Sequence, residues 1–191
     1  GHWAGEVWDR RKSGEVFPKW MSITAVSNAA GEVTHMVACY TDLSAQQKIH
    51  QLAFYDVLTG LPNRTLLRER LQLAQEEARR SQHWGALLLL DWDDFKSLND
   101  SLGHSQGDGL LRHIGQLLRA ALPSEATAAR LGGDEFAILL PQLARSQEQA
   151  AALAESLAER LLQSLGAPYC AAQDMQQPQY QGSASLGLTL F

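Results

Sequence analysis

Residues 128–140 read Ala-Ala-Arg-Leu-Gly-Gly-Asp-Glu-Phe-Ala-Ile-Leu-Leu, two apolar runs that are separated by a pair of glycines. This pattern predicts a β-hairpin with a tight turn. Asp134 and Glu135 follow the glycines directly, so the turn raises two carboxylates with little side-chain bulk beside them. Such a tip suits a cation and a phosphate chain, although the same residues also make an ordinary solvated turn.

A second apolar run ends in an aspartate. Residues 86–90 are Ala-Leu-Leu-Leu-Leu, which predicts a strand buried on both faces, and Asp91 closes the run. Ligand sites in α/β sheets gather at the carboxyl ends of strands, where a lone carboxylate is costly unless a cation or donors compensate it. Asp91 and Asp134 could therefore share one divalent ion, and hard oxygen ligands favour magnesium. We expect Asp93 or Asp94 to cap the following helix.

Two further polar residues are expected at adjoining helix ends. A short helix that carries Asn99 is predicted to stop at Gly103, and Ser105 can cap a second helix, which has apolar residues at helical spacing over 110–118. A carboxylate such as that of Asp108 can accept both the N1–H and the N2–H of guanine, and an asparagine amide can both donate and accept. The alternative is that both residues are only helix caps.

Together these segments resemble the GGDEF domains, the diguanylate cyclases of bacteria. The matching segments are Asp-Val-Leu-Thr-Gly-Leu-Pro-Asn-Arg at 56–64, Asp-Trp-Asp-Asp-Phe-Lys-Ser-Leu-Asn-Asp at 91–100, Gly103-His104 with Gly107-Asp108, and Arg-Leu-Gly-Gly-Asp-Glu-Phe at 130–136. Four segments in family order and at family-like spacing make the resemblance specific. The alternation of predicted strands and helices then indicates an α/β (α+β) sandwich, a mixed central sheet flanked by helices.

The resemblance implies a role for each matched position. Asp91 and Asp134, with the backbone carbonyl of Trp92, would hold Mg²⁺ (or Mn²⁺). Asp134 or Glu135 would help deprotonate the attacking 3′-hydroxyl, and Lys96 would stabilise charge on the phosphates. The residues expected to contact substrate are Asn99 and Asp108 as guanine readers, His104 and Phe95 in the same pocket, and Gly132 and Gly133 beside the phosphates.

The implied reaction joins two molecules of GTP. The 3′-oxygen of one GTP would attack the α-phosphorus of the other, and two such steps would give cyclic di-GMP and two pyrophosphates. Each domain would hold one GTP, so a homodimer would be needed for catalysis.

Two departures from the family pattern carry expectations. Many cyclases have Arg-x-x-Asp five residues before the glycine pair, where product binds and inhibits. Here those positions read Pro123-Ser124-Glu125-Ala126, so we expect no product inhibition through this site. The family also continues past the strand predicted at 183–191 with a helix that supplies Lys and Arg to phosphate. We therefore expect this stretch, truncated before the end of the GGDEF domain, to be weakly active or inactive alone.

Residues before 44 form a different pattern. Alternating residues predict three antiparallel strands, at 3–11, 16–27 and 33–42. Residues 5–15 and 40–44 resemble the second half of a PAS sensor domain. We therefore interpret 1–43 as the C-terminal strands of a partial PAS domain, 44–55 as a linker helix and 56–191 as the GGDEF domain. The linker is either a dimerising signal helix or a short connector.

Composition limits the partners. The net charge of −5 and a pI of about 5.6 argue against nucleic acid. The sequence has two distant cysteines, no apolar run of membrane-spanning length and no visible signal peptide. We therefore expect a cytoplasmic segment without direct membrane contact. The parent protein could still be anchored upstream.

Three functional hypotheses remain open at this point. The first is a diguanylate cyclase under PAS control. The alternative is a GTP-binding regulatory GGDEF domain that controls a downstream EAL cyclic di-GMP phosphodiesterase, because residues 49–56 and the form of 130–136 resemble domains that precede EAL. The third is a dimerisation scaffold with a decayed site.

Overall fold

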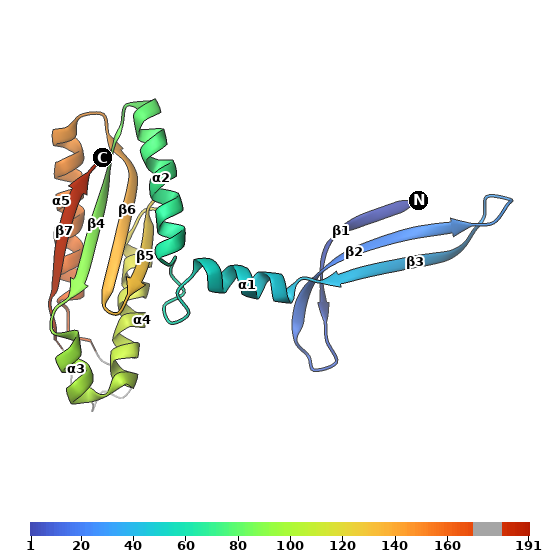
Figure 1. Ribbon diagram of the computed structural model, residues 1–191, viewed down its shortest axis with the longest axis horizontal. Helices are drawn as coiled ribbons and strands as arrows, with labels where there is room; N and C mark the ends of the chain where they lie inside the picture. Colours follow the sequence, from blue (N-terminus) through green and yellow to red (C-terminus); the bar gives the residue numbers. More distant parts are fainter. Residues whose placement is uncertain (170–180) are drawn as a thin grey trace. The chain divides into compact units, whose positions relative to one another are not determined.

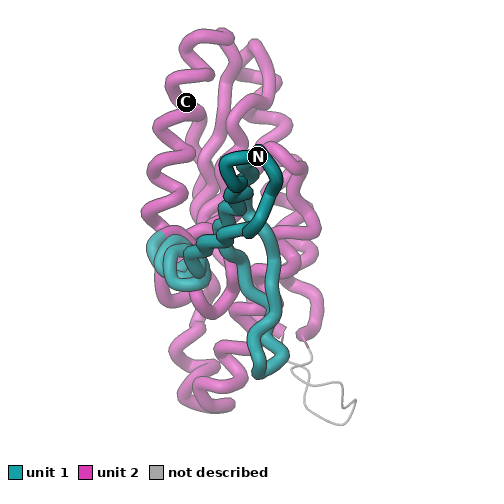
Figure 2. Tube along the Cα trace, turned by 90° about the vertical axis from the view of Figure 1, so that its right-hand side faces the viewer, with its two compact units in different colours: residues 1–53 teal, residues 54–191 magenta. Residues whose placement is uncertain are grey.

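The computed structural model describes residues 1–169 and 181–191. The chain divides into two compact units, residues 1–53 and 54–191, which are coloured separately in Figure 2. Most of the loop predicted over 166–182, and Cys170 with it, lies outside the described residues. Among the described helices, none combines the length and apolar character needed to cross a membrane.

The first unit is an antiparallel meander followed by a helix (Figure 1). Its elements are β1 (His2–Arg10), β2 (Val16–Ser27), β3 (Val33–Asp42) and α1 (Ser44–Phe54), and the strand order is β1-β2-β3. Gly14 and Gly31 have φ values of +92° and +83°, which explains glycine in the two hairpin turns. The three strands and the linker helix predicted from the sequence are confirmed, whereas the PAS assignment stays a prediction.

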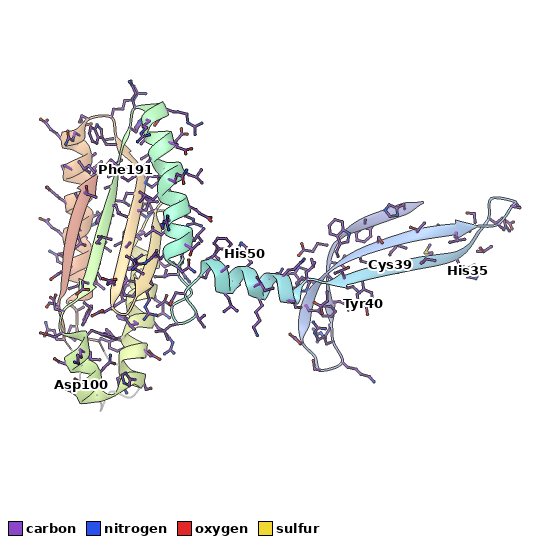
Figure 3. All side chains as sticks on the ribbon, viewed as in Figure 1. His35, Cys39, Tyr40, His50, Asp100 and Phe191 are labelled. Atoms are coloured by element: carbon purple, nitrogen blue, oxygen red, sulfur yellow. The ribbon has the colours of Figure 1, made fainter. Side chains whose placement is uncertain are left out.

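Little of the meander is buried. Phe17 is 8% exposed and lies under the Arg11 guanidinium, whose carbon is 4.0 Å from the ring centroid. The other large apolar side chains of the sheet are partly or well exposed, including Tyr40, which Figure 3 labels on β3 beside Cys39. Three strands with so small a core contribute little stability of their own.

The second unit contains a four-stranded sheet. Its strands are β4 (Trp84–Trp92), β5 (Thr127–Gly132), β6 (Glu135–Ala144) and β7 (Ala184–Leu190), in the order β5-β6-β4-β7. All three pairings are antiparallel. The predicted α/β sandwich is confirmed, but the expectation of a mixed sheet was wrong. The reason is topological, because β6 lies between the parallel strands β4 and β5.

Helices cover both faces of this sheet (Figure 1). They are α2 (Arg64–Ser81), α3 (Phe95–Leu102), α4 (His104–Ala121) and α5 (Gln147–Leu165). The larger core lies on the α4 and α5 side and includes Leu88, Leu90 and Phe136. On the other face α2 covers only part of the sheet, and Leu89 is 50% exposed. The expectation that β4 is buried on both faces was therefore wrong for the described residues.

The helix ends also correct two expectations. Asp94 occupies the N-cap position of α3 with φ +55°, but its side chain makes no capping hydrogen bond, and α4 starts at His104 with no contribution from Ser105. Side-chain caps occur elsewhere. Asn63 accepts hydrogen bonds from the first turn of α2, and Ser146 caps α5.

Candidate active site

The β5–β6 hairpin places the glycine pair at its tip, as the sequence predicts. Gly132 and Gly133 have φ values of +142° and +56°, a region that favours glycine. A Cβ atom built on either residue meets nothing within 4 Å. Both glycines are therefore required by the backbone torsion of the turn, and the space beside them is open.

Acidic side chains converge at this end of the sheet. Asp91, near the end of β4, is the register partner of Glu135 at the start of β6. Burial raises the pKa of Asp91, and the negative charges of Asp134, Glu135 and Asp93 raise it further. The structure thus brings together the two aspartates, one from a strand end and one from the hairpin, that the sequence singled out.

A cavity lies directly against these acids. Its volume is about 340 Å³, and Asp91, Glu135 and Ser185 line it together with apolar side chains from all four strands. A larger cavity, of about 730 Å³, is lined by the opposite end of β4 at Trp84 and by Phe191, and none of the predicted site residues borders it. The smaller cavity is therefore the candidate for ligand binding.

The donor set fits a hard divalent cation. Within the described part of the chain, no group of three or more His, Cys, Asp or Glu side chains is placed to hold a metal ion. Two carboxylates with the carbonyl of Trp92 would leave the remaining positions to water and phosphate, which is how Mg²⁺ is usually bound in proteins. The concentration of negative charge around Asp91 is consistent with such an ion.

Asp93 has a structural role that the sequence analysis missed. Its carboxylate accepts hydrogen bonds from the hydroxyls of Ser183 and Ser185, at 2.5 and 2.7 Å, and its backbone N–H donates to the carbonyl of Ser183 at 3.0 Å. The hydrogen bonds from Ser183 and then Ser185 lower the pKa of Asp93. These bonds tie the start of β7 to the loop after β4, which is why Asp93 does not cap α3.

Arg130 makes the most extensive side-chain contact near the hairpin tip. Its guanidinium donates to both carboxylate oxygens of Asp56, each at 3.1 Å. It also donates to the carbonyl oxygen of Gly133, through Nε at 3.1 Å and Nη2 at 2.7 Å. The side chains of Arg130 and Asp56 are only 11% and 22% exposed. One guanidinium therefore joins the turn before α2 to the tip of the hairpin.

Asp56 is held from a second side as well. Its Oδ1 accepts the backbone N–H of Thr59 at 2.8 Å and the Thr59 hydroxyl at 2.7 Å. Burial by itself would raise the pKa of Asp56, but the hydrogen bonds from Thr59 and Arg130 outweigh burial and lower it. Sequence reasoning matched Asp56 and Arg130 to the family without giving either a role, because they lie 74 positions apart.

The predicted guanine readers lie on two neighbouring helices. Asn99 is near the end of α3, close to Asp100, which Figure 3 labels, and Asp108 is in the first turns of α4. The Oδ1 atom of Asn99 is buried and has no hydrogen-bond partner within the described structure. Asp108 lies 4.0 Å from the guanidinium of Arg112. Asn99 and Asp108 remain candidates for base recognition.

The other predicted contacts are placed around the same end of the unit. Phe95 and Lys96 open α3, half-buried and exposed respectively, and His104 is exposed as the first residue of α4. Glu135 is exposed and lies 3.7 Å from the guanidinium of Arg64. The roles of all these residues remain predictions.

Comparison with known proteins gives the family. The family described as "Diguanylate cyclase, GGDEF domain" matches residues 53–190. The bifunctional diguanylate cyclase/cyclic di-GMP phosphodiesterase MucR of Pseudomonas aeruginosa is 38% identical over 169 residues, covering 88% of this chain and 23% of MucR. The diguanylate cyclase TpbB of the same species is 42% identical over 119 residues, covering 62% of this chain and 26% of TpbB.

Solved structures agree. The GGDEF domain of TpbB aligns with a TM-score of 0.64 at 36% identity, covering 72% of this chain and 75% of that one. A sensory box/GGDEF family protein from Caulobacter crescentus aligns with a TM-score of 0.63 at 38% identity, covering 72% and 83%. The chain therefore belongs to the GGDEF family of diguanylate cyclase domains. It spans about a quarter of the length of MucR and of TpbB.

Replacing Arg130 tests the connection that its side chain makes between the turn before α2 and the β5–β6 hairpin. We expect Arg130→Ala to lower the free energy of unfolding by about 3 kcal/mol, because it leaves the half-buried Asp56 carboxylate without its cation. Arg130→Lys should recover only part of this loss, since an ammonium cannot bind both partners in the same fork. Urea unfolding followed by circular dichroism measures both. The control is Arg64→Ala, which removes an exposed ion pair and should cost less than about 1 kcal/mol; equal losses at the two sites would contradict the assignment.

The lowered pKa of Asp56 predicts a pH dependence of stability. A carboxyl group whose pKa is lower in the folded state stabilises the fold above its unfolded-state pKa of about 4, and this contribution is lost as the pH falls through the folded-state value. The difference in unfolding free energy between wild type and Asp56→Asn should therefore be constant above about pH 5 and shrink at lower pH. Urea titrations at several pH values measure it, and a difference that grows on acidification would contradict the lowered pKa.

Proposed function

We propose that the second unit is the GTP-binding half-site of a diguanylate cyclase, which condenses two molecules of GTP into cyclic di-GMP and two pyrophosphates. The observation that carries this proposal is the convergence of Asp91, Asp134 and Glu135, of which Asp91 and Glu135 line a cavity of about 340 Å³. Membership of the GGDEF family supports it. A decayed scaffold is less consistent with the site, because every acid and amide of the expected set is present.

The chemistry follows from the residues. Asp91, Asp134 and the Trp92 carbonyl would hold Mg²⁺ or Mn²⁺, which when bound neutralises charge on the triphosphate. A carboxylate of the hairpin, Asp134 or Glu135, accepts the proton of the attacking 3′-hydroxyl. The new bond joins that 3′-oxygen to the α-phosphorus of the second GTP, and the bond to pyrophosphate breaks. Lys96 binds phosphate oxygens and stabilises the charge that develops there.

Catalysis would require a homodimer, because one domain offers one GTP site and the reaction consumes two. α1 is proposed to be the dimerising linker, with the apolar residues Ile49 and Leu52 on the helix face that would pair the two copies. Together with the meander of residues 1–43, interpreted as the end of a PAS domain, α1 would pass a sensory state to the spacing of the two GTP sites. The segment itself is proposed to be cytoplasmic, without direct contact with the membrane.

A regulatory GTP-binding domain is the second candidate. It is favoured by the names of two relatives, the bifunctional MucR and the cyclic di-GMP phosphodiesterase NbdA of Pseudomonas aeruginosa, which is 39% identical over 124 residues. In this version the domain binds GTP and controls an EAL domain in the parent chain. Both candidates bind GTP through the same base-binding residues, but only the cyclase converts GTP into cyclic di-GMP.

The decisive variant is Asp134→Ala in the parent protein. We expect wild type to convert GTP into cyclic di-GMP with magnesium, and the variant to lose at least about 100-fold in rate, because one of the two carboxylates that would hold the charge-neutralising metal ion is gone. Chromatographic quantification of cyclic di-GMP measures this. The matched control is Glu155→Ala, which removes an exposed acid of α5 and should leave the rate unchanged.

The outcomes separate the two candidates. GTP binding without product, in a wild-type parent shown to dimerise, supports the regulatory domain and overturns the cyclase. Absence of GTP binding in the wild-type parent overturns both.

The loop at 123–126 carries a separate prediction. These residues border cavities of about 230 and 300 Å³ but lack the Arg-x-x-Asp pair. Cyclic di-GMP added to the parent protein should therefore leave the initial rate of GTP turnover unchanged. Introducing Pro123→Arg together with Ala126→Asp should create inhibition by restoring a bidentate cation and its carboxylate. Strong inhibition of the wild type would show that product binds despite the missing pair.

A further inference from the structure

Asn99 of α3 is packed against a glycine of α4. A Cβ atom built on Gly107 would lie 2.0 Å from Oδ1 and 3.0 Å from Cγ of Asn99, and 3.1 Å from Cζ of Phe95. The space that any other amino acid would fill at position 107 is thus occupied by the amide of a predicted guanine reader. No larger residue fits there unless Asn99 moves.

The constraint at Gly107 differs in kind from that at the turn glycines. Gly103, Gly132 and Gly133 have φ values between +56° and +142° and open space where a Cβ would be. Gly107 has no such torsion, lies inside α4 and is buried. Glycine in the interior of a helix lowers its stability relative to alanine, so glycine at position 107 costs α4 some stability.

The amide that fills this space is also unusual. Oδ1 of Asn99 is buried, yet no hydrogen-bond donor in the described structure reaches it. Buried side-chain acceptors without partners are uncommon in folded proteins and ask for an explanation. The packing against Gly107 holds the amide in one orientation. The next residue, Asp108, is the second predicted reader, so the same helix turn places both.

We propose that Gly107 is a positioning residue for guanine recognition and acts through Asn99. The inference rests on the proposed function, because it assumes that Asn99 and Asp108 bind the base of GTP. A methyl group at position 107 displaces the Asn99 amide from its present position. The base contacts are then lost while the acids that face the phosphates keep their places, since those acids lie on the sheet and the hairpin.

A double-mutant cycle between the two positions tests this. Binding of GTP and of ATP, each with magnesium, is measured by titration calorimetry on wild type, Gly107→Ala, Asn99→Ala and the double variant. ATP serves as the probe for phosphate binding alone, because adenine lacks the N1–H and the 2-amino group. We expect Gly107→Ala to weaken GTP binding by about tenfold or more and ATP binding by less than about twofold.

The cycle should be strongly non-additive. Once Asn99 is alanine, the clash at position 107 is removed except at the Phe95 ring, so Gly107→Ala should add no further loss of GTP affinity. The control is Gly109→Ala on the same helix, whose Cβ would approach only the hydroxyl end of Tyr169, at 2.8 Å, and which should bind GTP as wild type does. Circular dichroism and thermal unfolding confirm that each variant is folded.

Three results would overturn the proposal. Wild-type GTP affinity in Gly107→Ala would refute the steric coupling, and additive losses in the double variant would show that Gly107 acts on something other than Asn99. Equal affinity of the wild type for GTP and ATP would refute base recognition itself, and with it the proposed function.

Discussion

The arrangement of the site depends on one guanidinium. Arg130 lies in β5 just before the hairpin tip. Its guanidinium binds the Asp56 carboxylate and the Gly133 carbonyl at the same time. The turn at Gly132 and Gly133 has no side chains to pack, and a Cβ atom built on either residue would meet nothing within 4 Å. The guanidinium therefore fixes the tip of the hairpin to the turn before α2, beside the backbone bond from Arg130 N–H to the Pro62 carbonyl. Because the pair of Arg130 and Asp56 is largely shielded from water, removing one partner costs more than breaking an exposed ion pair.

The antiparallel order of the sheet explains why so many acids meet at one end. β4 is central, with β6 on one side and β7 on the other, so the end of β4 meets the starts of both neighbours. Asp91 thus faces Glu135 on one side and Ser185 on the other, while Asp93 takes the hydroxyls of β7. The hydroxyls satisfy Asp93, whereas Asp91 remains beside like charges. Asp93 therefore serves the structure of the sheet, whereas Asp91 is available to bind a cation.

Two kinds of glycine serve the site. Those of the hairpin allow a torsion that other residues adopt at a cost, and they leave the approach to the acids open. Gly107 instead leaves room for the Asn99 amide between two helices. The first kind can be predicted from the sequence, because a pair of adjacent glycines between two apolar runs indicates a tight turn. The second becomes visible only when the neighbouring helix is in place.

Local patterns in the sequence were enough for the elements and for the list of candidate residues. Alternation predicted the three strands of the meander, the glycine pair predicted the β5–β6 hairpin, and Asp91 was identified because it closes an apolar run. These inferences hold because they depend on neighbours within a few residues of one another. The tertiary structure alone decided the antiparallel order of the sheet, the half-exposed face at Leu89, the bond from Arg130 to Asp56 and the use of Asp93 by β7. Each of these joins groups that are distant along the chain, and no short-range pattern records which of several acids a distant donor will reach.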